Sequence, residues 1–112
     1  MKPVQQDKFN FDGNCFSACI ASILEVPLNE VPNINSVPRP YEGWDLMFNY
    51  LKKKGYALLR IYSDIANKSY TNWALQSDED IYYIATGVGP RSSRHAVVYL
   101  HEKLAHDPHP DE

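Results

Sequence analysis

The first segment with a sustained hydrophobic pattern covers residues 15–24, CFSACIASIL. In a helix, this segment would carry apolar or small side chains on every face, which is typical of a central, buried helix. Asn14 is a favourable N-cap residue at its start, and Pro27 ends it. Residues 1–13 show no sustained period, so we expect an extended lead-in before the helix.

A second helix is predicted from Gly43, where apolar side chains recur at helical spacing: Leu46, Met47, Tyr50 and Leu51. The lysines at 52–54 suit the negative end of a helix, and Gly55 suits a C-terminal cap. Between the two helices, residues 28–31 predict a single turn. The segment from there to Pro40 is punctuated by prolines and predicts a loop.

Four later segments have the composition of β-strands and are separated by turn residues: 56–62, 80–86, 95–100 and 103–106. Residues 87–94 predict a turn-rich loop. The last two strands are expected to pair as a hairpin around His101 and Glu102. Two helices followed by about four closely connected strands favour an α+β fold, with the first helix packed on an antiparallel sheet.

Composition narrows the class of protein. The 112 residues are fewer than the roughly 150 of a typical domain, so one domain over residues 1–112 is expected. A net charge of -3 argues against a nucleic-acid partner. The sequence shows neither a membrane-spanning stretch nor a secretory signal, so we expect a cytoplasmic protein with no membrane partner. Cys15 and Cys19 lie four residues apart in one helix, a spacing that suits reduced thiols better than a disulfide or a zinc site.

Three side chains suggest nucleophilic chemistry. Cys15 lies at the start of the first helix, where unpaired N–H groups and the helix dipole favour the thiolate, the reactive form of cysteine. His95 opens an apolar strand, so its ring is expected at the mouth of the strand rather than in the core. Asp107 follows the partner strand and returns to the same end of the sheet. A carboxylate there would hold one imidazole nitrogen and leave the other facing the cysteine.

The remaining thiol and histidines have simpler interpretations. Cys19 lies one turn deeper in the helix and is expected to pack in the core. His101, His106 and His109 lie near acidic residues, but their spacing matches no strong zinc pattern, so we expect solvated surface and no metal site. For His109, which follows Pro108, an ordered tail residue is a simpler interpretation than a place at the rim of a catalytic site.

The chain carries GNCFSACIASILEVPLNEVPN at residues 13–33, HAVVYL at 95–100 and HDPHP at 106–110. Together these segments resemble a group of small papain-like proteins of bacteria and their phages. The histidine followed by the Asp-Pro pair is also similar to the cysteine-peptidase domains that trim bacteriocin leaders. The resemblance covers nearly the whole chain. It implies a papain-like fold with Cys15 as nucleophile, His95 as general base and acid, and Asp107 as the orienting group.

In such families a glutamine upstream of the cysteine helps to form the oxyanion hole, and the pattern here matches best at Gln6. The backbone N–H of Cys15 is a second donor for an oxyanion. Asn14, beside the nucleophile, is expected to contact the substrate. Trp44, in a loop beside the second helix, would line a groove, and Arg94 would hold a substrate carboxylate or phosphate.

The leading hypothesis is a cysteine hydrolase that cleaves a peptide or isopeptide-like amide through an acyl-enzyme, without a cofactor or a metal. Two alternatives remain open. One is a noncatalytic binding module of the same fold that captures a host or partner protein, and the other is an acyltransferase or amidotransferase that uses the same three residues. A chain this small leaves a shallow groove, which a protein partner or a homo-oligomer would complete.

Overall fold

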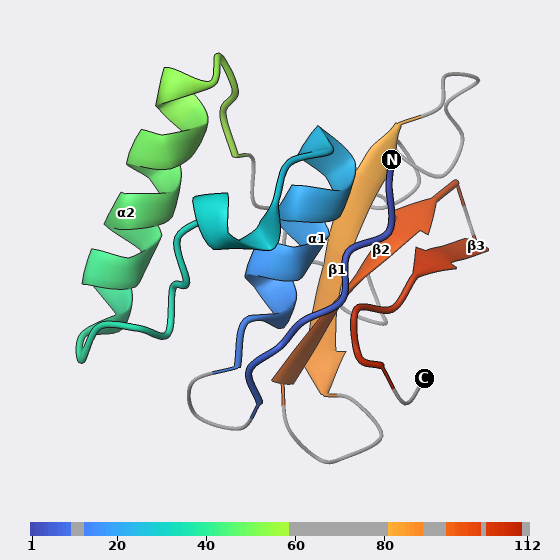
Figure 1. The fold of residues 1–112 in the computed structure, drawn as a ribbon, viewed down its shortest axis with the longest axis horizontal. Coiled ribbons are helices and arrows are strands. Elements are labelled where there is room, and N and C mark those ends of the chain that lie inside the picture. Colours follow the sequence, from blue (N-terminus) through green and yellow to red (C-terminus); the bar gives the residue numbers. More distant parts are fainter. Residues whose placement is uncertain (10–12, 59–80, 89–93, 102, 111–112) are drawn as a thin grey trace, which may run out of the picture.

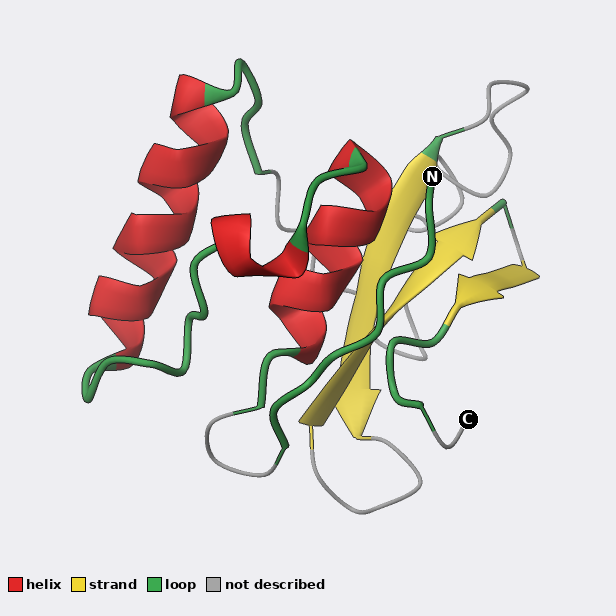
Figure 2. Cartoon of the chain, in the orientation of Figure 1, coloured by secondary structure: helices red, strands yellow, loops and turns green. Residues whose placement is uncertain are grey.

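The computed structural model describes residues 1–9, 13–58, 81–88, 94–101 and 103–110. Its elements follow in the order α1 (Cys15–Leu24), the 3-10 turn η2 (Leu28–Glu30), α2 (Pro40–Lys53), β1 (Tyr82–Val88), β2 (Arg94–Leu100) and β3 (Lys103–His106). Helix α1 lies between α2 and the sheet, so the described part of the chain has three layers (Figures 1 and 2). The predicted α+β class, with the first helix packed on an antiparallel sheet, is confirmed.

Helix α1 has the predicted bounds, and six successive residues, 17–22, are buried. The two serines in this stretch satisfy their hydroxyls within the protein. Ser17 Oγ donates to Pro32 O at 2.6 Å, and Ser22 Oγ accepts the N–H of Val4 at 2.9 Å. Buried hydroxyls that are hydrogen-bonded avoid the free energy lost by an unpaired polar group. The serines therefore attach the central helix to the segments that cover it.

Helix α2 begins at Pro40, before the predicted start at Gly43. Proline suits the first position of a helix, because its fixed φ is helical and the N–H that it lacks has no intrahelical acceptor there. Trp44 is consequently helical, and its predicted place in a loop is wrong. Gly43 lies where α2 meets the preceding segment, and a Cβ there would lie 2.0 Å from Ile34 O. Only glycine permits this approach.

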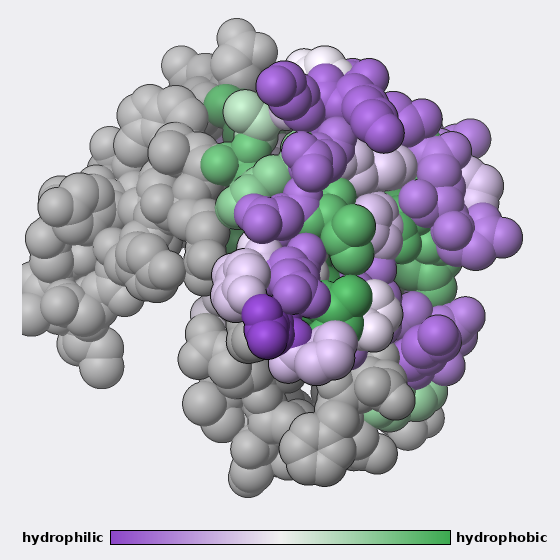
Figure 3. Space-filling model, turned by 90° about the vertical axis from the view of Figure 1, so that its left-hand side faces the viewer, coloured by the Kyte–Doolittle hydropathy of each residue, from purple (hydrophilic) through white to green (hydrophobic). Residues whose placement is uncertain are grey.

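The inner face of α2 packs on α1. Met47 and Leu51 are buried in one apolar cluster with Ile20, Ala21 and Val31. Leu46 and Phe48 are 45% and 40% exposed, so part of the hydrophobic surface of α2 faces outward. On the side of the molecule that α2 occupies, hydrophilic side chains dominate the described surface, with hydrophobic ones between them (Figure 3). Gly55, with φ at 87°, follows the helix as the predicted cap.

The described strands form an antiparallel sheet in the order β1-β2-β3. Pairing runs from Tyr82 opposite Leu100 to Val88 opposite Arg94, so β1 lies two residues later than predicted and includes Gly87, which was assigned to the loop. The hydrogen-bonded pairing of β1 continues into Gly87 and Val88 because β2 provides partners there. The turn-like composition of these residues does not reveal such partners. Residues 89–93 of that predicted loop lie outside the described residues.

Strands β2 and β3 form the predicted hairpin. Its turn includes His101, whose φ of 56° is left-handed, and the pairing shifts register between Val98 and Tyr99. Ala96 and Val98 pack with the buried Cys19 of α1. This cluster seats the helix on the sheet.

The predicted strand over residues 56–62 lies mostly outside the described residues, and residues 56–58 carry no regular secondary structure. Three of the four expected strands are thus described. No helix among the described residues is long and apolar enough to cross a membrane.

Candidate active site

His95 and Asp107 meet at the end of the sheet where β2 begins and β3 has just ended. The Nε2 atom of His95 lies 2.6 Å from Asp107 Oδ1, and the two side chains are 9% and 15% exposed. A carboxylate only accepts hydrogen bonds, so the ring hydrogen is assigned to Nε2 and Nδ1 is the other ring nitrogen. The predicted contact between His95 and Asp107 is present.

Cys15 lies against the start of the same strand. Its thiol is half-buried and is hydrogen-bonded by the backbone of Ala96, the residue after His95, and by the backbone of Phe16 and of Cys15 itself. It also packs against the cluster that joins α1 to the sheet. No hydrogen bond joins the thiol to His95 in the described part of the chain, but all three predicted residues lie at one end of the fold.

Burial raises the pKa of the Cys15 thiol above its ordinary value, and the nearby Asp107 carboxylate raises it further. The backbone hydrogen bonds lower the pKa without outweighing the loss of hydration. The expectation that the helix end keeps this sulfur ionised at rest is therefore wrong in direction. Desolvation depends on what packs around the atom, and the position in the helix does not reveal it.

Cys19 has no exposed surface and packs against Ala96 and Val98, so its predicted role in the core is confirmed. Burial raises the pKa of its thiol far above the ordinary value. We therefore expect the Cys19 thiol to react slowly.

His109 is buried at 8% exposure, so the expectation of solvated surface is wrong for this residue. Its backbone N–H donates to Asp107 Oδ1 at 3.0 Å, and its ring meets the rings of His95 and Phe9 edge-to-face, with centroids 6.3 and 5.2 Å apart. An aspartate that accepts the N–H two residues later forms an Asx turn, which folds the chain back on itself. The Asp-Pro-His sequence contains the signal for this turn.

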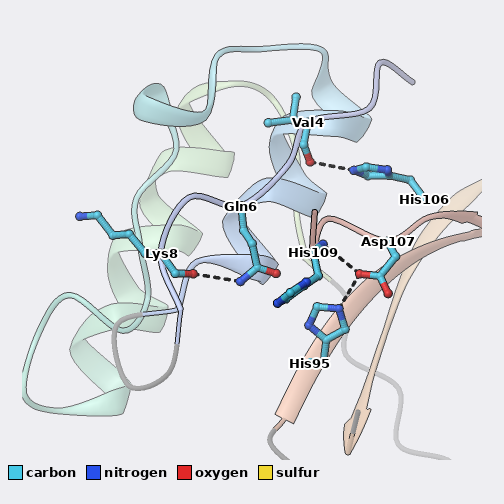
Figure 4. Close-up of polar contacts among 7 residues, drawn as sticks. All are labelled: Val4, Gln6, Lys8, His95, His106, Asp107 and His109. Carbon is cyan, nitrogen blue, oxygen red and sulfur yellow. Dashed lines mark hydrogen bonds and ion pairs between the residues drawn. The ribbon is translucent and has the colours of Figure 1, made fainter. Parts of the chain in front are cut away.

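The N-terminal segment holds the residues around Asp107 in place. His106 Nε2 lies 2.7 Å from Val4 O, and the N–H of Gln6 donates to Pro108 O at 2.9 Å. In Figure 4 the segment that carries Val4 and Gln6 runs beside the one that carries Asp107. The expectation of solvated surface is wrong for His106 as well, because this bond anchors a half-buried ring.

Gln6, predicted to contribute to an oxyanion hole, is 7% exposed. Its Nε2 donates to Lys8 O at 2.9 Å, whereas Oε1 is buried and has no hydrogen-bond partner among the described residues. The atom near a carbonyl oxygen must be the nitrogen, so this contact assigns the orientation of the amide. One N–H of the carboxamide is thus engaged within the N-terminal segment, and a role in binding an oxyanion stays a prediction.

Asn14 precedes α1 as predicted, but its side chain does not cap the helix. Its Oδ1 accepts the N–H groups of Asp7 and Lys8 at 3.1 and 3.0 Å, and its Nδ2 donates to the Asp7 carboxylate at 2.7 Å. These bonds hold the N-terminal segment against the start of the helix. Substrate contact by Asn14 stays a prediction.

Trp44 lies on α2 with its ring edge against Phe16, at 5.1 Å between centroids, and it stacks with Phe48 at 6.1 Å. Phe16 follows Cys15, so these rings begin one residue from the proposed nucleophile. Arg94 is the first residue of β2, next to His95. Substrate contacts by Trp44 and Arg94 stay predictions.

A groove of about 690 Å³ lies between the N-terminal segment and β3; it is lined by Pro3, Gln5, Leu104, Ala105, His106 and Asp107. The groove reaches Asp107, whose carboxylate also contacts His95. Across the described ranges, no three His, Cys, Asp or Glu side chains converge where they could hold a metal ion. Comparisons with protein-family models, with curated proteins and with solved structures find no match for this chain.

Proposed function

We propose that the chain is a papain-like cysteine hydrolase that cleaves a peptide or isopeptide-like amide through a Cys15–His95–Asp107 triad. The observation that carries the proposal is the 2.6 Å contact between His95 Nε2 and Asp107 Oδ1. The Cys15 thiol lies against the backbone of Ala96, the residue after His95 in β2. A base that is oriented by a third polar group and placed near a nucleophile is the arrangement that covalent catalysis requires.

The raised pKa of the Cys15 thiol decides the form of the first step. Because burial raises the pKa of Cys15, His95 acts as a general base that takes the thiol proton while Sγ attacks the amide carbonyl carbon. The carbon–nitrogen bond then breaks, and His95 returns that proton to the leaving amine. Water hydrolyses the resulting thioester, which releases a carboxylic acid and restores the thiol.

Asp107 has two functions in this scheme. It keeps the ring hydrogen on Nε2, so that Nδ1 is the nitrogen that accepts the thiol proton, and it stabilises the imidazolium that then forms. The oxyanion would rest on the backbone N–H of Cys15 at the start of α1, where the helix dipole favours negative charge. Gln6 is the proposed side-chain donor for the same charge.

A noncatalytic binding module is the second candidate function. The raised pKa of Cys15 supports the binding module, because a purely structural cysteine also lacks an enhanced thiolate fraction. In this case a protein partner would bind whether or not the sulfur is present. A transferase differs from the hydrolase only in the acceptor of the acyl group, so added amines distinguish the two.

The test is the reaction of the protein with a library of peptide aldehydes, which form hemithioacetals with a catalytic cysteine, followed by hydrolysis of the matching fluorogenic amides. We expect an adduct on Cys15 in the wild type and in Cys19→Ala, and none in Cys15→Ala. His95→Ala and Asp107→Asn should lower kcat by roughly 10³-fold or more, as loss of triad members does elsewhere.

Equal adduct formation by wild type and Cys15→Ala would refute the hydrolase. A wild-type kcat in His95→Ala would show that His95 is not the general base. Product that forms only when an acceptor amine is added would assign the same site to a transferase.

A further inference from the structure

His109 lies inside the candidate site, although the scheme above assigns it no step. Its ring is 73° from the plane of the His95 ring, at 6.3 Å between centroids, and it meets Phe9 at 66° and 5.2 Å. Both pairs have the edge-to-face geometry that aromatic rings favour. The His109 side chain, which is 8% exposed, thus has a ring neighbour on each of two segments, His95 on β2 and the 42% exposed Phe9 in the N-terminal segment.

The backbone of His109 holds the orienting group as well. Its N–H donates to Asp107 Oδ1 at 3.0 Å, the same oxygen that His95 Nε2 contacts at 2.6 Å. Pro108, between them, is fully buried, so the link from the carboxylate to His109 is short and enclosed. Oδ1 of the carboxylate thus faces a main-chain donor and a ring donor, and its low exposure of 15% strengthens both bonds.

The N-terminal segment closes around this ring. Gln6 is tied by its N–H to Pro108 O at 2.9 Å, and the end of its side chain points toward the His109 ring (Figure 4). Phe9, three residues later, makes the edge contact. The ring of His109 therefore lies between the N-terminal segment and His95.

We propose that His109 is a positioning residue: its ring confines the imidazole of His95, and its N–H fixes the carboxylate of Asp107. Without the ring, the imidazole of His95 would gain space for other staggered rotamers, which lose the bond to Asp107. The consequence for catalysis rests on the proposed function. The restriction of the His95 ring does not depend on catalysis, so it can be measured in the protein without substrate.

The test compares His109→Ala, which removes the ring, with His109→Phe, which keeps an aromatic ring of similar shape. His106→Ala is the matched control, because it breaks the bond to Val4 O in the same segment and keeps the His109 ring beside His95 and the His109 N–H on Asp107. The first readout is the tautomer of His95 from nitrogen-15 NMR of the full chain. The second is kcat and KM for a fluorogenic amide.

We expect a single Nε2–H tautomer of His95 in the wild type, in His109→Phe and in His106→Ala, and a mixture of tautomers in His109→Ala. In His109→Ala, kcat should fall by up to roughly 100-fold while KM changes little, because misplacement of a catalytic group by about 1 Å has an effect of that size. His109→Phe should retain most of kcat.

A single Nε2–H tautomer and an unchanged kcat in His109→Ala would overturn the proposal. An equal loss in His109→Ala and His106→Ala would also overturn it, because it would show general loosening of the segment. If His109→Ala does not fold, loss of the Nε2–H tautomer in a folded His109→Phe has the same consequence. An inactive wild type would refute the hydrolase, while the tautomer measurement would still decide the role of His109.

Discussion

Cys15 and Cys19 lie one turn apart on α1, yet the first is half-buried and the second has no exposed surface. The helix turns the Cys15 thiol toward the start of β2 and buries the Cys19 thiol against the middle of the sheet. Two identical groups in one helix are therefore expected to differ in chemistry.

Iodoacetamide should modify Cys15 and spare Cys19 in the folded protein. Because burial raises the pKa of Cys15, the thiolate fraction at neutral pH is small, and the rate should rise about tenfold per pH unit through pH 8. Peptide mapping by mass spectrometry gives the site and the rate, with Cys15→Ala as the control. A rate that is already constant near pH 7 would contradict the raised pKa and indicate a stable thiolate.

Stability should fall on the alkaline side because of Cys19. Burial raises the pKa of this thiol in the folded state above the ~8.5 of an unfolded chain, so the unfolded state loses its proton first as the pH rises. The contribution is complete below pH ~8.5 and declines above it, by about 1.4 kcal/mol per pH unit.

Urea unfolding of wild type and Cys19→Ala between pH 8.5 and 10 measures this slope. The variant should show the smaller dependence on pH. The range ends where tyrosines begin to titrate; Tyr50 itself, whose pKa burial and Glu30 raise to about 12, titrates later. Identical slopes in the two proteins would show that the buried thiol does not govern alkaline stability.

Gly43→Ala should destabilise the protein by at least about 2 kcal/mol, because its Cβ would lie 2.0 Å from Ile34 O and the backbone must move. Gly87→Ala is the matched control, since a Cβ there meets nothing within 4 Å and should change stability by about 0.5 kcal/mol or less. Chemical unfolding measures both. Equal effects would mean that the contact between α2 and Ile34 is not tight.

Asn14→Ala should lower the free energy of unfolding by about 1–3 kcal/mol, because it leaves the N–H groups of Asp7 and Lys8 without their acceptor. Asn49→Ala, at an exposed site of α2, should have an effect within about 0.5 kcal/mol. Hydrogen exchange at residues 7 and 8 should speed up only in Asn14→Ala. Unchanged exchange there would show that Asn14 does not hold the N-terminal segment.

Part of the fold was predictable because its signals are local. The bounds of α1 follow from Asn14, an apolar run and Pro27, and the hairpin of β2 and β3 follows from two strand-like segments around a short turn. The start of α2 differs from the prediction, because proline occurs both at the end of a loop and at the first position of a helix, where Pro40 lies. Local composition does not separate these two uses of proline.

The sequence by itself determined which residues could serve as nucleophile, base and orienting group, and that Asp107 returns to the end of the sheet where His95 lies. Only the tertiary structure decided the direction in which the pKa of Cys15 is shifted and the burial of His109 beside His95. The physical reason is that hydration and ring contacts depend on neighbours from distant parts of the chain. Helix position and residue spacing describe only the neighbours that are close in the sequence.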